Sequence, residues 1–148
     1  MRQRQRGQTL ALFAVALLTC VGFVGLAVDG SRLFQAHLGA QVLADEAANA
    51  AAQQVDTGPG SALRAGRPPE LIGGRGPGSA FDAADSYLTE RVADGHTSWT
   101  ISVSPREVDV VVHRGVEMAF LGAIGIGLQT VDAEGFGTPV SGIIGPDQ

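Results

Sequence analysis

The chain contains no lysine, and its ten basic residues are all arginines. Three of them, Arg2, Arg4 and Arg6, precede the first long apolar run. The chain after this run contains seven arginines and fifteen acidic residues, so its net charge is negative. Nucleic acid and anionic lipid surfaces both require basic patches on their protein partners. The acidic balance of the downstream part therefore argues against both as its partner.

Cysteine and aromatic residues are scarce. Cys20 is the single cysteine and falls inside the apolar run, which excludes a disulfide framework, a CxxC motif and a soluble thiol nucleophile. Aromatic residues make up 5% of a chain that is 45% hydrophobic, so Ala, Val and Leu supply most of the apolar character. Beyond the apolar run, we expect one small domain of about 100 residues or fewer with a thin core.

Motifs for metal, phosphate and nucleophile chemistry are missing. The three histidines, His37, His96 and His113, fall on three different expected elements and form no HxxxH or HxH pattern. Gly122, Gly125 and Gly127 match neither GxGxxG nor a P-loop, and we interpret them as turn glycines. The sequence thus predicts no metal, no cofactor and no small-molecule substrate.

Carboxylate pairs are present but lack a pocket that would raise a pKa. Asp45-Glu46 and Asp132 with Glu134 fall on surfaces expected to face solvent, and no GxSxG elbow occurs. The sequence therefore predicts that the protein is not an enzyme.

About twenty uncharged residues from Thr9 to Val28 form the strongest signal in the sequence. At 1.5 Å rise per residue, such a helix crosses a hydrocarbon core of about 30 Å. The arginines of the basic tail, residues 1–8, favour a cytoplasmic N-terminus and an exported C-terminal part. A cleaved signal peptide shows the same basic start, but this run is longer than a typical signal core, so we favour a transmembrane helix over 9–28.

A helical pattern continues without a break over residues 29–56. One apolar stripe recurs at three- and four-residue steps, with Phe34, Leu38 and Val42 beside it. The stripe, our candidate interaction or packing face, comprises Leu33, Ala36, Ala40, Leu43, Ala47 and Ala50. Its small residues allow a second backbone to come close, and we expect the chain's own sheet to cover most of it, the alternative being a partner helix.

The expected membrane boundary is marked by Arg6 on one side and by Asp29 and Arg32 on the other. Asp29 and Arg32 lie one helical turn apart, so we expect a solvated pair at the outer interface.

Beyond the helix, residues 57–79 are rich in Gly and Pro and predict a loop. Residues 80–148 predict a small α/β exported region. Ser79, three residues before Asp82, resembles a capping box for a short helix, and the alternating residues Trp99–Val103 and Val108–His113 predict an antiparallel hairpin. A helical turn around residues 117–121 and a third strand near residues 129–134 complete the sheet.

The segments Arg6-Gly7-Gln8, Val28-Asp29-Gly30-Ser31-Arg32-Leu33 and the Ala-rich stretch from Gln41 to Ala52 resemble the TadE/TadG-like proteins of tight-adherence (Flp) pilus systems. The resemblance covers about residues 6 to 52. It implies an α+β, pilin-like protein, in which a long N-terminal helix packs its exported half on a small antiparallel sheet, and it implies a structural or assembly role.

One position departs from the pattern of such proteins. Prepilin-type motifs place Glu five residues after the cleavage-site Gly, whereas here Gly7 is followed at that distance by Leu12 and then by Phe13. In pilin-like assembly the resemblance assigns that Glu to pairing with a neighbour's free amino terminus. Its absence argues against peptidase processing after Gly7 and against incorporation as a repeating pilin.

The sequence thus predicts a bacterial single-pass protein of the cell (inner) membrane, non-catalytic, acting in assembly of a tight-adherence pilus or related secretion apparatus. Its expected partners are the membrane and other Tad/Flp assembly proteins or pilin, with no nucleic acid. The alternative is a membrane-anchored extracytoplasmic binding or regulatory module unrelated to pili.

Overall fold

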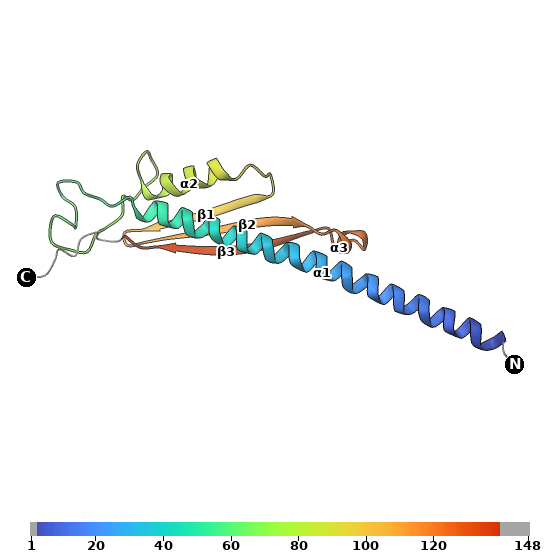
Figure 1. Ribbon diagram of the computed structural model, residues 1–148. Coiled ribbons are helices and arrows are strands. Elements are labelled where there is room, and N and C mark those ends of the chain that lie inside the picture. Colours follow the sequence, from blue (N-terminus) through green and yellow to red (C-terminus); the bar gives the residue numbers. More distant parts are fainter. Residues whose placement is uncertain (1–2, 140–148) are drawn as a thin grey trace, which may run out of the picture. The chain divides into compact units, whose positions relative to one another are not determined.

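The computed structural model describes residues 3–139, with side chains from Thr9 onward. The elements run α1 (Gln3–Ala52), α2 (Ala80–Arg91), β1 (Thr97–Ser104), β2 (Glu107–Glu117), α3 (Phe120–Ala123) and β3 (Leu128–Gly137), as Figure 1 shows. A long N-terminal helix packed on a three-stranded antiparallel sheet confirms the predicted α+β fold.

The first helix is continuous over 50 residues, and it begins before the predicted start at residue 9 and ends at Ala52, before the predicted end at residue 56. No proline interrupts it, since the first one is Pro59, and its alanines have the highest intrinsic helix propensity. The helix ends at Ala52, just before the Gly/Pro-rich stretch begins.

The chain divides into two compact units. Of the described residues, the first unit holds 3–35 and 116–129, and the second holds 36–115 and 130–139. Helix α1, β2 and β3 each contribute residues to both units, whereas α3 belongs to the first and α2 and β1 to the second.

The sheet has the order β1-β2-β3, and β1 pairs antiparallel with β2 from Thr97 opposite Arg114 to Ser104 opposite Glu107. Its inward face carries Val108, Val110 and Val112, all fully buried. This alternation is the one predicted from the sequence, because successive strand residues point to opposite faces.

Helix α2 begins where the sequence predicted it. The Ser79 side chain accepts a hydrogen bond from the backbone N–H of Asp82, at 3.1 Å. This cap satisfies one of the helix's free amide groups. Trp99 then donates from its Nε1 to Asp85 at 2.9 Å, which fastens α2 to the sheet.

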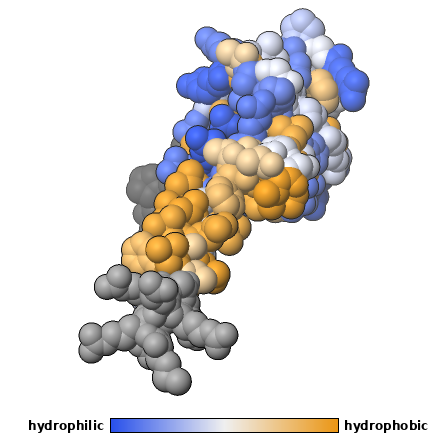
Figure 2. Space-filling view, turned by 90° about the vertical axis from the view of Figure 1, so that its right-hand side faces the viewer, coloured by the Kyte–Doolittle hydropathy of each residue, from blue (hydrophilic) through white to orange (hydrophobic). Residues whose placement is uncertain are grey.

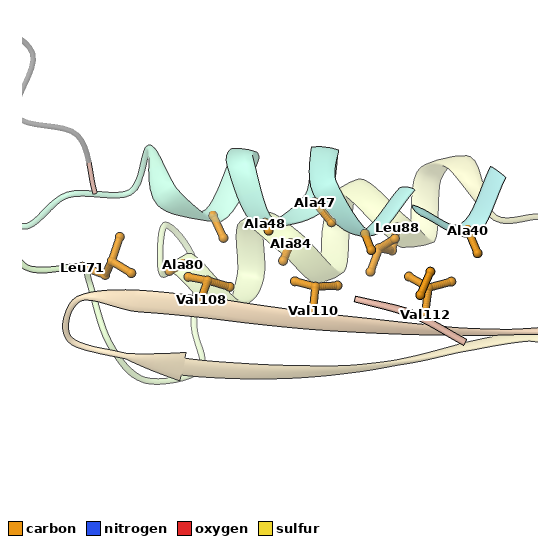
Figure 3. Close-up of a cluster of buried hydrophobic side chains, with 13 residues drawn as sticks. Ala40, Ala47, Ala48, Leu71, Ala80, Ala84, Leu88, Val108, Val110 and Val112 are labelled. Atoms are coloured by element: carbon orange, nitrogen blue, oxygen red, sulfur yellow. The ribbon is translucent and has the colours of Figure 1, made fainter. Parts of the chain in front are cut away.

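The core of the second unit lies between the sheet and two helices. Figure 3 shows alanines of α1 and the Ala80, Ala84 and Leu88 side chains of α2 facing the valines of β2. Residues 57–79 hold no helix or strand, but Leu71 makes an isolated bridge with Val55 and is buried in this core. The loop thus contributes to the fold in a way that its composition did not predict.

Candidate packing face and membrane boundary

The buried face of α1 in the second unit consists of alanines. Ala40, Ala44, Ala47, Ala48 and Ala51 are fully buried and belong to the hydrophobic core. Of the stripe proposed from the sequence, Ala40 and Ala47 lie on this face, whereas Leu43 and Ala50 are only half-buried. The predicted stripe included Leu43 but not Ala44, whereas the structure buries Ala44 and leaves Leu43 half-buried against the core.

Two glycines of β3 explain why the small residues are at the centre of the face. A Cβ at Gly135 would lie 2.3 Å from the carbonyl carbon of Ala44, and one at Gly137 would lie 2.3 Å from the carbonyl oxygen of Ala48. Real Cβ atoms are not found at such distances, so only glycine fits at either position. The helix backbone and the strand backbone therefore meet directly, and the larger Leu43 is only partly buried.

Gln41 joins the same contact from the side. Its Nε2 donates to the backbone carbonyl of Glu134 at 2.7 Å and to the Asp45 carboxylate at 3.2 Å. The Gln41 amide thus binds the β3 backbone, a contact that the sequence did not predict.

Within the first unit, Asp29 is the buried polar residue of the helix, with 1% of its surface exposed. Its carboxylate accepts hydrogen bonds from the backbone N–H groups of Ala119 (2.8 Å), Phe120 (3.0 Å) and Leu121 (2.7 Å). These are the amide groups around the start of α3, which lack partners within that short helix. Asp29 thus caps α3 from a helix some ninety residues away in the chain.

The expected solvated pair of Asp29 and Arg32 is therefore wrong. The Asp29 carboxylate faces the chain instead of water, while Arg32 is exposed. Neighbouring Gly25 provides the space for this arrangement, since a Cβ there would lie 2.2 Å from the Phe120 ring. The third boundary residue, Arg6, has a side chain outside the described residues.

The N-terminal half of α1 exposes large apolar side chains. Leu10, Phe13, Leu18 and Phe23 are each 70 to 75% exposed. Figure 2 shows hydrophobic side chains gathered along this part of the helix. Helix α1 contains the one stretch among the described residues that is long and apolar enough to cross a membrane.

The acidic pairs singled out in the sequence take part in structural contacts. Glu46 accepts a hydrogen bond from the Tyr87 hydroxyl of α2. Burial raises the pKa of that hydroxyl, and the Glu46 contact raises it further. Asp132 lies 2.7 Å from Nδ1 of His113 on the exposed part of the sheet. Among the described residues, no three His, Cys, Asp or Glu side chains converge as metal ligands would.

The segment with these features matches a known family. The family model Tad, described as "Putative Flp pilus-assembly TadE/G-like", matches residues 7–54. The match confirms the resemblance stated from the sequence, which covers about the same residues. Residues 7–54 are here called the Tad segment. No curated protein and no solved structure matches the chain.

The Tad segment contains Asp29, Gln41 and Glu46, whereas their partners at residues 119–121, Glu134 and Tyr87 lie beyond it. The sequence did not predict the close approach of Gly135 and Gly137 to α1, and it did not predict that Asp29 caps α3. The signal for the first was present, because glycines two apart share one face of a strand just as residues four apart share one face of a helix. The signal for the α3 cap was the acidic residue Asp29 directly after the apolar run.

Proposed function

We propose that the chain is a non-catalytic, single-pass component of the cell membrane that acts in assembly of a tight-adherence pilus or a related secretion apparatus. The observation that carries this proposal is the division of the Tad segment. Its first part is an exposed apolar helix, and its second part supplies the alanine face on which a small domain is built. This is the construction expected of an anchored structural component.

The proposed orientation places the N-terminus in the cytoplasm and the domain outside. Three arginines precede the apolar run, and positive charge near the end of a span is retained on the cytoplasmic side. The acidic balance of the remaining chain is compatible with export, since acidic residues contribute little to orientation.

The alanine face is covered by β3, so we propose that contacts with pilin or other assembly proteins use another side of α1. Phe34, Leu38 and Val42 lie at four-residue spacing and are 48 to 63% exposed. Such a stripe on a helix suits an apolar contact with a second protein.

The experiment is deletion of the gene in its host, followed by complementation with the full chain and counting of surface pili. Loss of pili that the full chain restores would support the proposal. Unchanged piliation in a strain whose Flp system is otherwise functional would contradict it and favour the anchored binding or regulatory module.

Two complementing variants sharpen the assay. Leu38→Glu places a charge on the exposed stripe and should reduce piliation at an unchanged protein level. The adjacent, exposed His37→Glu is the matched control and should complement fully. Equal piliation by both variants would exclude the stripe as the contact.

A further inference from the structure

We propose that residues 118–128, here called the tip segment, contact the membrane lipids beside α1, so that the chain touches the bilayer through a second element. The lipid leaflet concerned is the one that the exported domain faces. This inference rests on the proposed membrane span, and it assigns to the tip segment a role that the family match at residues 7–54 does not cover.

The position of the tip segment along α1 sets its depth. The Phe120 ring lies against Gly25, and the backbone N–H groups of residues 119–121 bind Asp29. Gly25 and Asp29 are four residues apart, about 6 Å along the helix axis. Because the apolar run ends at Val28, the tip segment lies at the level of the last turn of the span.

The tip segment has an apolar surface without charge. No charged residue occurs between Glu117 and Asp132. Ile124, Ile126 and Leu128 are 67%, 44% and 55% exposed, and nothing in the first unit covers them. Leu26, in the last turns of the apolar run, is also exposed, and Figure 2 shows hydrophobic residues gathered along this part of the molecule.

Seven of the eleven backbone N–H groups of the tip segment have a hydrogen-bond acceptor in the first unit, and such pairing lowers the cost of contact with lipid. Met118 N–H donates to the carbonyl of Gly127 and closes the loop. The N–H groups of Ile124, Gly125 and Ile126 bond to carbonyls of residues 121 and 122, and Gly125 adopts the positive φ of 94° that this turn needs. Residues 119–121 donate to Asp29, so most amides of this backbone are already paired where it meets the membrane surface.

The occupant of this surface is lipid because the span itself fixes the tip segment at the boundary. Apolar side chains at that level enter the region between headgroups and acyl chains. The contact is apolar and not electrostatic, since the tip segment carries no arginine to attract anionic headgroups.

The experiment uses the full chain with Cys20→Ala, which removes its single cysteine, reconstituted in vesicles of phosphatidylethanolamine and phosphatidylglycerol. One environment-sensitive fluorophore is attached at Ile124→Cys, and quenching by nitroxide-labelled lipids is measured. We expect quenching as strong as that of a Leu26→Cys label, with emission shifted to the blue relative to a Leu63→Cys label. Leu63 is a suitable control because it is an exposed apolar residue of the loop after α1.

A Phe13→Cys label, in the middle of the span, separates the two proposals. Quenching at Phe13 with an Ile124 label as unquenched as Leu63 would overturn the lipid contact and leave the span intact. Absence of quenching at Phe13 would overturn the span and the lipid contact with it. An Ile124 label that is exposed in vesicles but shielded in native membranes would show a protein partner there, and this too would overturn the proposal.

Discussion

At the scale of single residues, Asp29 joins segments ninety or more positions apart in the sequence. A charged carboxylate beside a bilayer is costly unless it is paired, and three backbone N–H groups supply that pairing here. The Asp29 charge at the end of the apolar run therefore binds the backbone of a distant segment and does not merely mark the end of the run.

Asp29→Ala should release the start of α3, because the amides of residues 119–121 would lose their acceptor. We expect faster hydrogen exchange at these three amides in the full chain in detergent micelles, measured by mass spectrometry. Arg32→Ala removes the exposed neighbouring charge and should leave their exchange unchanged. Equal exchange in the two variants would show that the cap does not order the segment.

Gly135 makes a second prediction at this scale. Gly135→Ala would push a methyl group into the backbone of Ala44 and should lower stability by about 1 to 3 kcal/mol, as overpacking does. For a domain of this size that corresponds to a fall in Tm of about 4–8 °C per kcal/mol. Thermal unfolding of the full chain in micelles measures it.

Gly95→Ala is the matched control, since a Cβ at Gly95 would meet nothing within 4 Å. Its Tm should stay within about 2 °C of the parent. If Gly135→Ala is tolerated equally well, the close approach of β3 to α1 is not needed for folding.

At the scale of elements, α1, α2 and the β1-β2 hairpin could be predicted from the sequence, because each carries its own periodicity or cap. The exact buried face of α1 could not be. The pattern from Leu33 to Ala50 marks an apolar side, but which residues lie at its centre depends on Gly135 and Gly137, far along the chain. The same holds for α3, whose cap comes from Asp29.

The alanine face makes a prediction of its own. Ala47 is fully buried, so Ala47→Leu should overpack the contact between helix and sheet and cost about 1 to 3 kcal/mol. Ala93→Leu is the same chemical change at an exposed position and should stay within about 0.5 kcal/mol. Thermal melts compare the two, and a stable Ala47→Leu chain with weakened complexes in membrane pull-downs would mean that the face meets a partner helix instead.

At the scale of the whole molecule, a charged residue in the middle of the apolar part of α1 should reduce membrane insertion. Val24 is 65% exposed, which fits a lipid-facing position, and Val24→Asp should cost about 2 to 3 kcal/mol of membrane insertion. Carbonate extraction of membranes measures the inserted fraction. The control is Gln35→Asp, which lies beyond the apolar run and should insert like the parent. Full insertion of Val24→Asp would show that the span does not include residue 24.

The candidate span was predictable from the sequence because length, apolarity and flanking charge are all local properties. The surface of the small domain was not predictable, because distant segments assemble it and the Tad segment ends at residue 54. The tip segment is an example: in the sequence its apolar residues resemble ordinary loop residues, but in the structure Phe120 lies against Gly25 and residues 119–121 bind Asp29, at the end of the candidate span.

We propose that α1 anchors the chain in the membrane with its domain outside the cytoplasm. In the Cys20→Ala background, Gln3→Cys and Leu63→Cys each introduce a single cysteine. The cells are treated with a maleimide that does not cross the cell membrane, under conditions in which it passes any outer envelope layer while the cell membrane stays intact. We expect labelling of the Leu63→Cys chain alone, with the Gln3→Cys chain labelled only after cell lysis. Labelling of the Gln3→Cys chain in intact cells, with protection of the Leu63→Cys chain, would contradict it.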